Sequence, residues 1–152
     1  MNTVSTIVRS LTLAGLTTLG MTLAVSPAPV QAAQATTFIA LANTGQEVPA
    51  GSGTGVGIGY FTLGSDDKLC VSFTFGGLAG TLAAAHIHGP TVPGVNAAIL
   101  FPLPTANPIN TCVGPLDKDQ KKDLRRGLYY INVHTSTVPA GEIRGQIEPI
   151  RK

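Results

Sequence analysis

Alternating residue types between positions 51 and 59 constrain the fold of this chain more than any other feature. Glycine occupies every odd position there, and the even positions hold Ser, Thr, Val and Ile. A repeat of two is the period of a β-strand, whose successive side chains point to opposite faces. One face of this strand would be bare glycine, which lets another part of the chain approach the backbone closely. Residues 50–54 alone can instead form a glycine-rich loop.

Several other short segments show the same period and are separated by turns that contain Gly, Pro or Asn. In residues 69–75 apolar side chains alternate with Cys, Ser and Thr, and Gly-Ser-Asp-Asp at 64–67 predicts a hairpin turn before them. The proline-containing stretch 101–115 is predicted to be a loop. Five further segments complete the strand candidates: 36–42, 81–88, 96–103, 128–135 and a last strand within 138–150.

One short surface helix is predicted after position 116. Asp117 can cap its first turn, and Gln120 completes a capping box three residues later. Gly127 provides the stop signal, and Leu116 and Leu124 are nearly the only apolar residues of this segment. Seven or eight short strands with one such helix predict an all-β protein, folded as an antiparallel β-sandwich.

The first 32 residues have the features of a secretory signal peptide that is cleaved from the mature protein. Arg9 gives the start one positive charge, residues 11–25 are uncharged and largely apolar, and proline and small residues follow. The apolar run is shorter than the roughly 20 residues that a membrane-spanning helix needs. Residues 33–152 are therefore predicted to form one exported domain, secreted or periplasmic, with no transmembrane segment.

Charge and cysteine content narrow the class of protein further. The chain has ten basic and eight acidic side chains, and nine basic ones remain without Arg9. No basic stripe for nucleic acid is therefore expected. Cys70 and Cys112 are the two cysteines, and an even pair in an oxidising compartment predicts a disulfide, with two buried free thiols as the alternative.

The three histidines are candidates for a metal site. His86 and His88 are two residues apart in one predicted strand, so both point to the same face. His134 lies in another predicted strand, on the face opposite its apolar residues. If the two strands are neighbours, the imidazoles form one cluster that can bind zinc or copper. Hydrogen bonds from the rings to turn carbonyls or to a carboxylate are the structural alternative.

Four other polar residues are candidates for structural or partner contacts. Glu142 and Arg144 alternate in the last predicted strand and would share one face. Arg144 can contact an anion or a partner, or form an ion pair with Glu142 or Glu47. Asn132 precedes His134 by two residues and can orient its imidazole. The sequence contains no serine-hydrolase elbow and no phosphate-binding loop, so no catalytic residues are predicted.

Three segments together make the chain resemble the CHRD domain, a module found in chordin and in many exported bacterial proteins. They read LANTGQEVPAGSGTGVGIGYFTL at 41–63, AAHIHGP with GVNAAILF at 84–90 and 94–101, and GLYYINVHTSTVPAGEIRGQI at 127–147. The resemblance implies an immunoglobulin-like or related β-sandwich in an extracellular module, and it supplies no catalytic residues. The His-x-His strand also resembles copper/zinc superoxide dismutase, but three histidines cannot supply the four copper ligands of that enzyme.

These observations predict a non-enzymatic, exported binding or interaction module whose ligand is an unknown protein or glycan. The alternative is a copper- or zinc-binding protein that uses His86, His88 and His134. The interaction module is expected to need no cofactor, and copper or zinc belongs to the alternative only.

Overall fold

The computed structural model describes residues 36–150, which form an all-β domain with one short α-helix. The predicted signal peptide at 1–32 lies outside the described residues. Nine strands are present in the described part: β1 (Thr37–Asn43), β2 (Val56–Leu63), β3 (Leu69–Gly76), β4 (Leu82–His88), β5 (Ile99–Leu103), β6 (Ile109–Val113), β7 (Tyr130–Thr135), β8 (Ile143–Gln146) and β9 (Glu148–Pro149). A 3₁₀ turn (Thr44–Gln46) follows β1, and helix α1 (Lys118–Arg125) follows β6.

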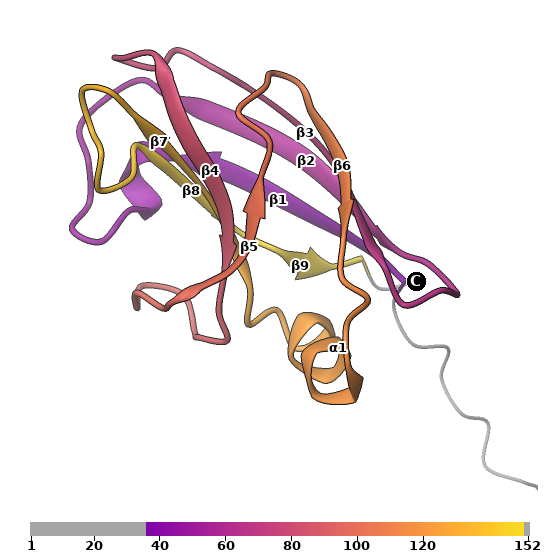
Figure 1. Ribbon diagram of the computed structural model, residues 1–152. Coiled ribbons are helices and arrows are strands. Elements are labelled where there is room, and N and C mark those ends of the chain that lie inside the picture. Colours follow the sequence, from indigo (N-terminus) through magenta and orange to yellow (C-terminus); the bar gives the residue numbers. More distant parts are fainter. Residues whose placement is uncertain (1–35, 151–152) are drawn as a thin grey trace, which may run out of the picture. The chain divides into compact units, whose positions relative to one another are not determined.

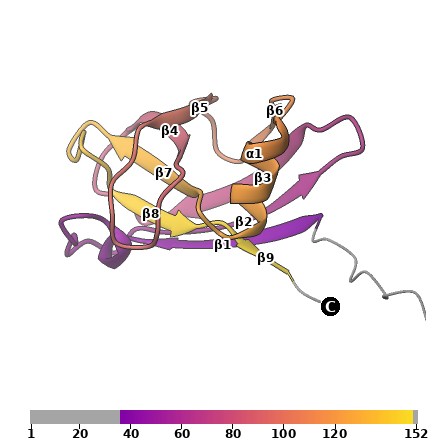
Figure 2. The same cartoon turned by 90° about the horizontal axis from the view of Figure 1, so that it is seen from below.

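All strand pairs are antiparallel and form one hydrogen-bonded order, β5-β4-β7-β8-β1-β2-β3-β6, with β9 paired to β1. The sheet curls until its two end strands, β5 and β6, lie beside each other (Figure 1). Seen from below, β4 and β5 lie opposite β1 and β2 (Figure 2). The result is a nearly closed, barrel-like sheet. The all-β antiparallel prediction is confirmed, and the particular sandwich type stays a prediction.

The glycine-rich segment and the hairpin after it form as the alternation predicts. β2 and β3 pair from Val56–Gly76 at one end to Leu63–Leu69 at the other. The strand begins only at Val56, so the loop alternative for 50–54 is correct. Gly57 and Gly59 face the ring of Phe73 so closely that a Cβ on either residue would clash with that ring. The bare face of β2 therefore leaves room for the ring of Phe73 in the core.

The core lies inside the curled sheet and is filled by the apolar face of each long strand. On β3 every second residue from Leu69 onward is buried, while Cys70, Ser72 and Thr74 are exposed. The same alternation buries Phe38, Ala40 and Ala42 on β1. The remaining core side chains come from β2 and β4 to β8, from α1 and from the segments beside them: Phe61, Leu63, Ala85, Ile87, Leu103, Ile109, Leu116, Leu124, Tyr129, Ile131, Val133, Ile143 and Ile147.

The prediction that residues 101–115 form a loop is wrong in part, because β6 lies within that stretch. Ile109 pairs with Phe73 and is fully buried, and Cys112 lies directly opposite Cys70. The predicted disulfide joins these two cysteines. Prolines flank this five-residue strand on both sides, so the alternation of residue types did not identify it. Its pairing to β3 and the disulfide, both long-range contacts, hold it in the sheet.

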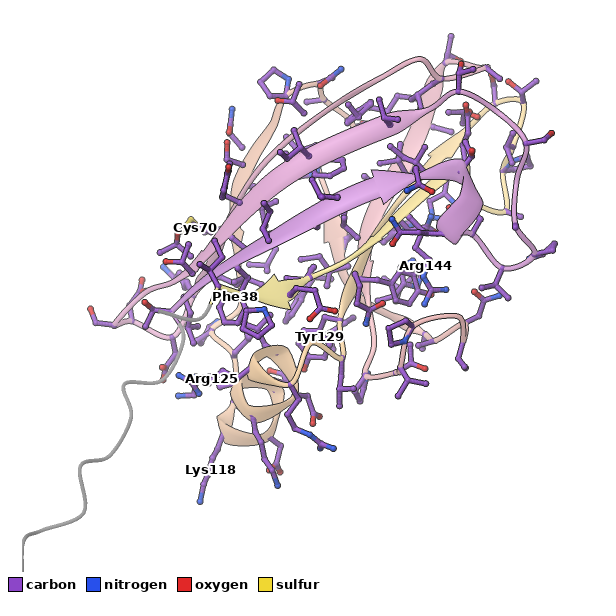
Figure 3. All side chains as sticks on the ribbon, turned by 180° about the vertical axis from the view of Figure 1, so that it is seen from behind. Phe38, Cys70, Lys118, Arg125, Tyr129 and Arg144 are labelled. Atoms are coloured by element: carbon purple, nitrogen blue, oxygen red, sulfur yellow. A yellow bond between two sulfur atoms is a disulfide. The ribbon has the colours of Figure 1, made fainter. Side chains whose placement is uncertain are left out.

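Helix α1 begins and ends where its capping residues predict. The Asp117 carboxylate accepts a hydrogen bond from the Gln120 backbone N–H at 2.8 Å, and the Gln120 side chain accepts one from the Asp117 N–H at 2.9 Å. Gly127 has a φ of +70°, which favours glycine after a helix. Leu124 is fully buried, whereas Lys118 projects away from the sheet (Figure 3). Within the described residues, no helix is long and apolar enough to cross a membrane.

Candidate metal centre

The three histidines come together because β4 and β7 are neighbours. Ile87 pairs with Ile131 and both point into the core, so the residues on either side of them point outward. His86, His88 and His134 therefore lie on the outer face of this strand pair. His86 Nδ1 lies 3.1 Å from His134 Nε2, and one ring nitrogen from each histidine lies within 4.8 Å of the other two. The predicted cluster is present.

Backbone carbonyls hold two of these rings in a defined tautomer. His88 Nδ1 lies 3.0 Å from the Ala97 carbonyl oxygen, and His134 Nδ1 lies 3.1 Å from that of Pro139. A carbonyl oxygen only accepts hydrogen bonds, so each Nδ1 carries the proton and donates it. Each Nε2 is then left with a lone pair: that of His134 accepts a hydrogen bond from His86 Nδ1, and a ring nitrogen with a lone pair is the form that ligates a metal.

The Nε2 atom of His88 is buried without a hydrogen-bond partner in the described part of the chain. His88 as a whole is only 8% exposed. A buried polar atom that makes no hydrogen bond typically costs about 1–3 kcal/mol. Because Nδ1 already donates to Ala97, this Nε2 carries the lone pair, and a cation shared with the other two rings would satisfy it.

Burial and mutual repulsion keep the imidazoles of β4 neutral. Burial lowers the pKa of His86, and the neighbouring His134 and His88 lower it further. Burial also lowers the pKa of His88; the bond to Ala97 opposes this shift, while His134 and Arg144 add to it. Neutral imidazole is the state that binds a metal, so both rings are ready to ligate at neutral pH.

The cluster contains three imidazoles and is partly open to solvent. His86 and His134 are each half-buried, whereas His88 lies deeper. Among the described residues, no carboxylate or thiolate belongs to the group. Three protein ligands leave a further coordination position for water or another small ligand, as in zinc sites that keep an open position.

The predicted polar residues Glu47 and Asn132 contact each other beside the cluster. Asn132 pairs with His86 across β4 and β7, but its side-chain amide donates to the Glu47 carboxylate and, at 2.9 Å, to the Ile143 carbonyl. Burial raises the pKa of Glu47; the hydrogen bond from Asn132 and the charge of Arg144 oppose that shift. Asn132 therefore orients Glu47 and the loop after β1.

Glu142 and Arg144 do not share a face, contrary to the prediction from their spacing. Glu142 precedes β8 and follows Gly141, whose φ is +133°, so the strand alternation starts only after it. Its carboxylate accepts hydrogen bonds from the Thr135 hydroxyl and the Ala79 N–H, each at 2.5 Å. The salt bridges among the described residues include none between Glu142 and Arg144.

Arg144 instead lies on the outer face, where Tyr130 separates it from the histidines. Its guanidinium lies 3.5 Å from the centre of the Tyr130 ring, and the ring of His88 stacks on the same tyrosine at 4.8 Å. Arg144 also donates to the Val95 carbonyl at 2.7 Å and to Asn96 Oδ1 at 3.2 Å. Figure 3 shows Arg144 to the right of α1 and clear of that helix.

Three groups that support the cluster were not identified from the sequence as parts of the site. Tyr130 could have been found, because it shares the predicted outer face of its strand with Asn132 and His134. The carbonyls of Ala97 and Pro139 carry no side-chain signal, since any residue has such an oxygen.

Comparisons with known proteins agree with the resemblance seen in the sequence. No curated protein and no solved structure matches this chain. The family model of the CHRD domain matches residues 38–147, which extends from the second residue of β1 to the residue after β8. The matched region includes all three histidines and both cysteines. The chain therefore belongs to the CHRD domain family.

Proposed function

We propose that this protein is an exported binding module that holds a zinc or copper ion with His86, His88 and His134. The observation that carries this proposal is the buried Nε2 of His88, which has no partner in the described residues although Nδ1 is fully used. A hydrogen-bonded cluster without a metal would leave that nitrogen unsatisfied. An ion bound by the three rings satisfies it.

The spacing of the ring nitrogens suits such an ion. Two nitrogens bound to tetrahedral zinc at about 2.0–2.1 Å lie roughly 3.3–3.4 Å apart. His86 Nδ1 and His134 Nε2 are 3.1 Å apart, and the widest separation in the cluster is 4.8 Å. Binding of one ion would require the more distant nitrogens to move closer together. Imidazole ligands suit both zinc and copper, so the donor set is compatible with either ion and does not choose between them.

An extracellular location fits the other features of the chain. The CHRD domain match and the Cys70–Cys112 disulfide are compatible with an oxidising compartment. The predicted signal peptide at 1–32 would direct export, to the medium or to a periplasm. We propose no catalytic activity, and we take the fold to be related to the immunoglobulin-like or superoxide-dismutase-like sandwiches.

Metal content of the exported protein tests this function. The wild-type chain, His88→Ala and Asn110→Ala are produced with the native signal and without a polyhistidine tag. Asn110 is an exposed residue of β6, away from the cluster. Elemental mass spectrometry is applied to each protein as purified and again after incubation with Zn²⁺ or Cu²⁺ followed by desalting.

The expected result is close to one ion per wild-type chain and per Asn110→Ala chain. For His88→Ala we expect a loss of affinity greater than the roughly 10- to 100-fold typical of removing an outer-shell partner. A wild-type protein that stays free of both metals after incubation would overturn the proposal. Equal metal content in His88→Ala would also overturn it.

A second candidate function, interaction with a protein or glycan, is favoured by exposed apolar side chains on the outer face of β1 and β2. Leu41 pairs with Ile58, and the exposed fractions are 60% and 45%. Val56 and Tyr60 continue this patch along β2 at 57% and 54%. Apolar side chains grouped in this way often mark an interaction site.

Crosslinking from this face tests the second function. A photoreactive side chain replaces Ile58, and in a control protein it replaces Lys118, an exposed residue of helix α1 away from the β1–β2 face. A partner captured in the native envelope or medium from position 58 alone supports the interaction role. Identical products from both positions contradict it.

A further inference from the structure

Arg144 is a buried cation that is held by one loop. Its side chain is 2% exposed, and burying a charge is costly unless hydrogen bonds replace its water. The salt bridges of the described residues do not include it. Its hydrogen bonds go to neutral acceptors, the carbonyl of Val95 and the side chain of Asn96. A guanidinium in this position can hold that loop in place over the sheet.

Residues 95–97 form a loop segment that connects Arg144 to the proposed metal site. Arg144 holds the first two residues, and the Ala97 N–H donates to the Tyr130 hydroxyl at 3.2 Å. The Ala97 carbonyl then accepts the Nδ1 proton of His88 at 3.0 Å. Asn96 also donates to the Val48 carbonyl at 3.0 Å, which ties the segment to the loop after β1.

Tyr130 also connects Arg144 with His88, because both side chains stack on its ring. β7 lies between β4 and β8, so its Tyr130 is reached by His88 from one side and by Arg144 from the other. The rings of His88 and Tyr130 are nearly parallel, at 5° and 4.8 Å, and the guanidinium lies 3.5 Å from the tyrosine centroid. The plane of His88 and its Nδ1 partner are therefore both set by groups that Arg144 contacts.

We propose that Arg144 is the positioning residue of the metal site: through residues 95–97 and Tyr130, it fixes His88 with Nδ1 protonated and Nε2 free for the ion. This inference rests on the proposed metal-binding function, because it names what prepares one of the three ligands. Outer-shell groups that orient a histidine typically change metal affinity by about 10- to 100-fold when removed.

The test combines a metal affinity with the state of the His88 ring in the same proteins. Arg144→Gln removes the cation and the stacking. Arg144→Lys keeps the charge and removes the planar fork that contacts Val95 and Asn96 together. Arg126→Gln, at an exposed arginine after α1, is the matched control for loss of one positive charge. Because Arg144→Gln can destabilise the fold, Tyr130→Phe and Asn96→Ala probe the same path without removing a buried charge.

Two measurements are made on each protein. Competition with a chelator of known affinity gives the dissociation constant for Zn²⁺. Long-range ¹H–¹⁵N spectra of the metal-free protein show which nitrogen of His88 carries the proton, and the backbone spectrum verifies that each variant is folded.

We expect Arg144→Gln to bind Zn²⁺ about 10- to 100-fold more weakly than wild type and to lose the single His88 tautomer. The Zn²⁺ affinities of Arg144→Lys and Tyr130→Phe should lie between those of wild type and Arg144→Gln. The affinity of Arg126→Gln should equal that of wild type. Folded Arg144 variants with unchanged affinity and an unchanged tautomer would overturn the inference and leave the proposed function standing. Failure of wild type to bind Zn²⁺ or Cu²⁺ would overturn the proposed function. The tautomer spectra of the metal-free proteins would still decide whether Arg144 positions His88.

Discussion

At the scale of the residue, Gly59 shows why one face of β2 has no side chains. A Cβ at this position would lie 2.6 Å from Phe73 Cδ2 and 2.9 Å from the Ser72 carbonyl oxygen. We therefore expect Gly59→Ala to lower the free energy of unfolding by about 1–3 kcal/mol, as overpacked cores do. Urea denaturation measures this change. Gly76→Ala is the control, since nothing lies within 4 Å of a Cβ there, and equal effects of the two substitutions would contradict the explanation.

At the same scale, the buried carboxyl of Glu47 makes the stability of the fold depend on pH. Burial raises the pKa of its carboxyl above the ordinary value for glutamate, against the hydrogen bond from Asn132 and the charge of Arg144. The folded protein therefore holds this proton more tightly than the unfolded chain. The resulting stabilisation is fully present below the pKa of the unfolded chain's carboxyl and is lost as pH rises through the folded pKa.

Glu47→Gln removes this titration and keeps an oxygen that can accept from Asn132. We expect the stability of wild type relative to Glu47→Gln to be greater near pH 4 than at pH 7. Chemical denaturation of both proteins from pH 4 to 8 measures the difference. A difference that is constant across this range, or that grows toward pH 7, would show that the carboxyl pKa is not raised.

At the scale of the element, the disulfide attaches β6 to the sheet. Cys70 and Cys112 are directly opposite in the β3–β6 pair and are 42 residues apart in sequence. In the chain-entropy model, a crosslink over that separation stabilises the fold by about 4 kcal/mol. The effect is large for β6 because the strand is short and lies at one end of the sheet order.

Cys70→Ser with Cys112→Ser should therefore lower the unfolding free energy by about 2–4 kcal/mol. Denaturant titration under non-reducing conditions measures it. The control replaces Ser72 and Asn110 by alanine, since these residues form a neighbouring cross-strand pair and have exposed side chains. A double serine variant as stable as wild type would show that β6 is held by its hydrogen bonds and by Ile109 alone.

At the scale of the whole molecule, the proposed metal site joins parts that are distant in sequence. Its rings come from β4 and β7, and the loops at 95–97 and after His134 supply the carbonyls. An ion that binds only the folded chain stabilises it, by about 2.7 kcal/mol at a concentration 100 times the dissociation constant.

For a domain of this size we expect saturating Zn²⁺ to raise the midpoint of thermal unfolding by about 10 °C. Circular dichroism or calorimetry with and without Zn²⁺ measures the shift, and His88→Ala is the control. An equal shift in that variant would assign the stabilisation to another site.

Local sequence patterns predicted many of the strands, the helix and the faces of their side chains, because such patterns encode the direction in which each side chain points. Period-two alternation identified β2, β3 and β7, including which residues of β3 face the core. The capping box identified α1, and the alternation placed the three histidines on outer faces. Each of these features depends on residues within a few positions of one another.

Tertiary structure alone decided which strands are neighbours and what covers their outer faces. The histidines meet only because β4 pairs with β7, a contact between residues 48 positions apart. β6 exists because it pairs with β3, although prolines flank it. Arg144 stacks on Tyr130 and bonds to the loop at 95–97, because β8 pairs with β7 and that loop covers their outer face. A sequence pattern sets the face on which a side chain lies, whereas its partners depend on long-range strand pairing and loop closure, which no local pattern records.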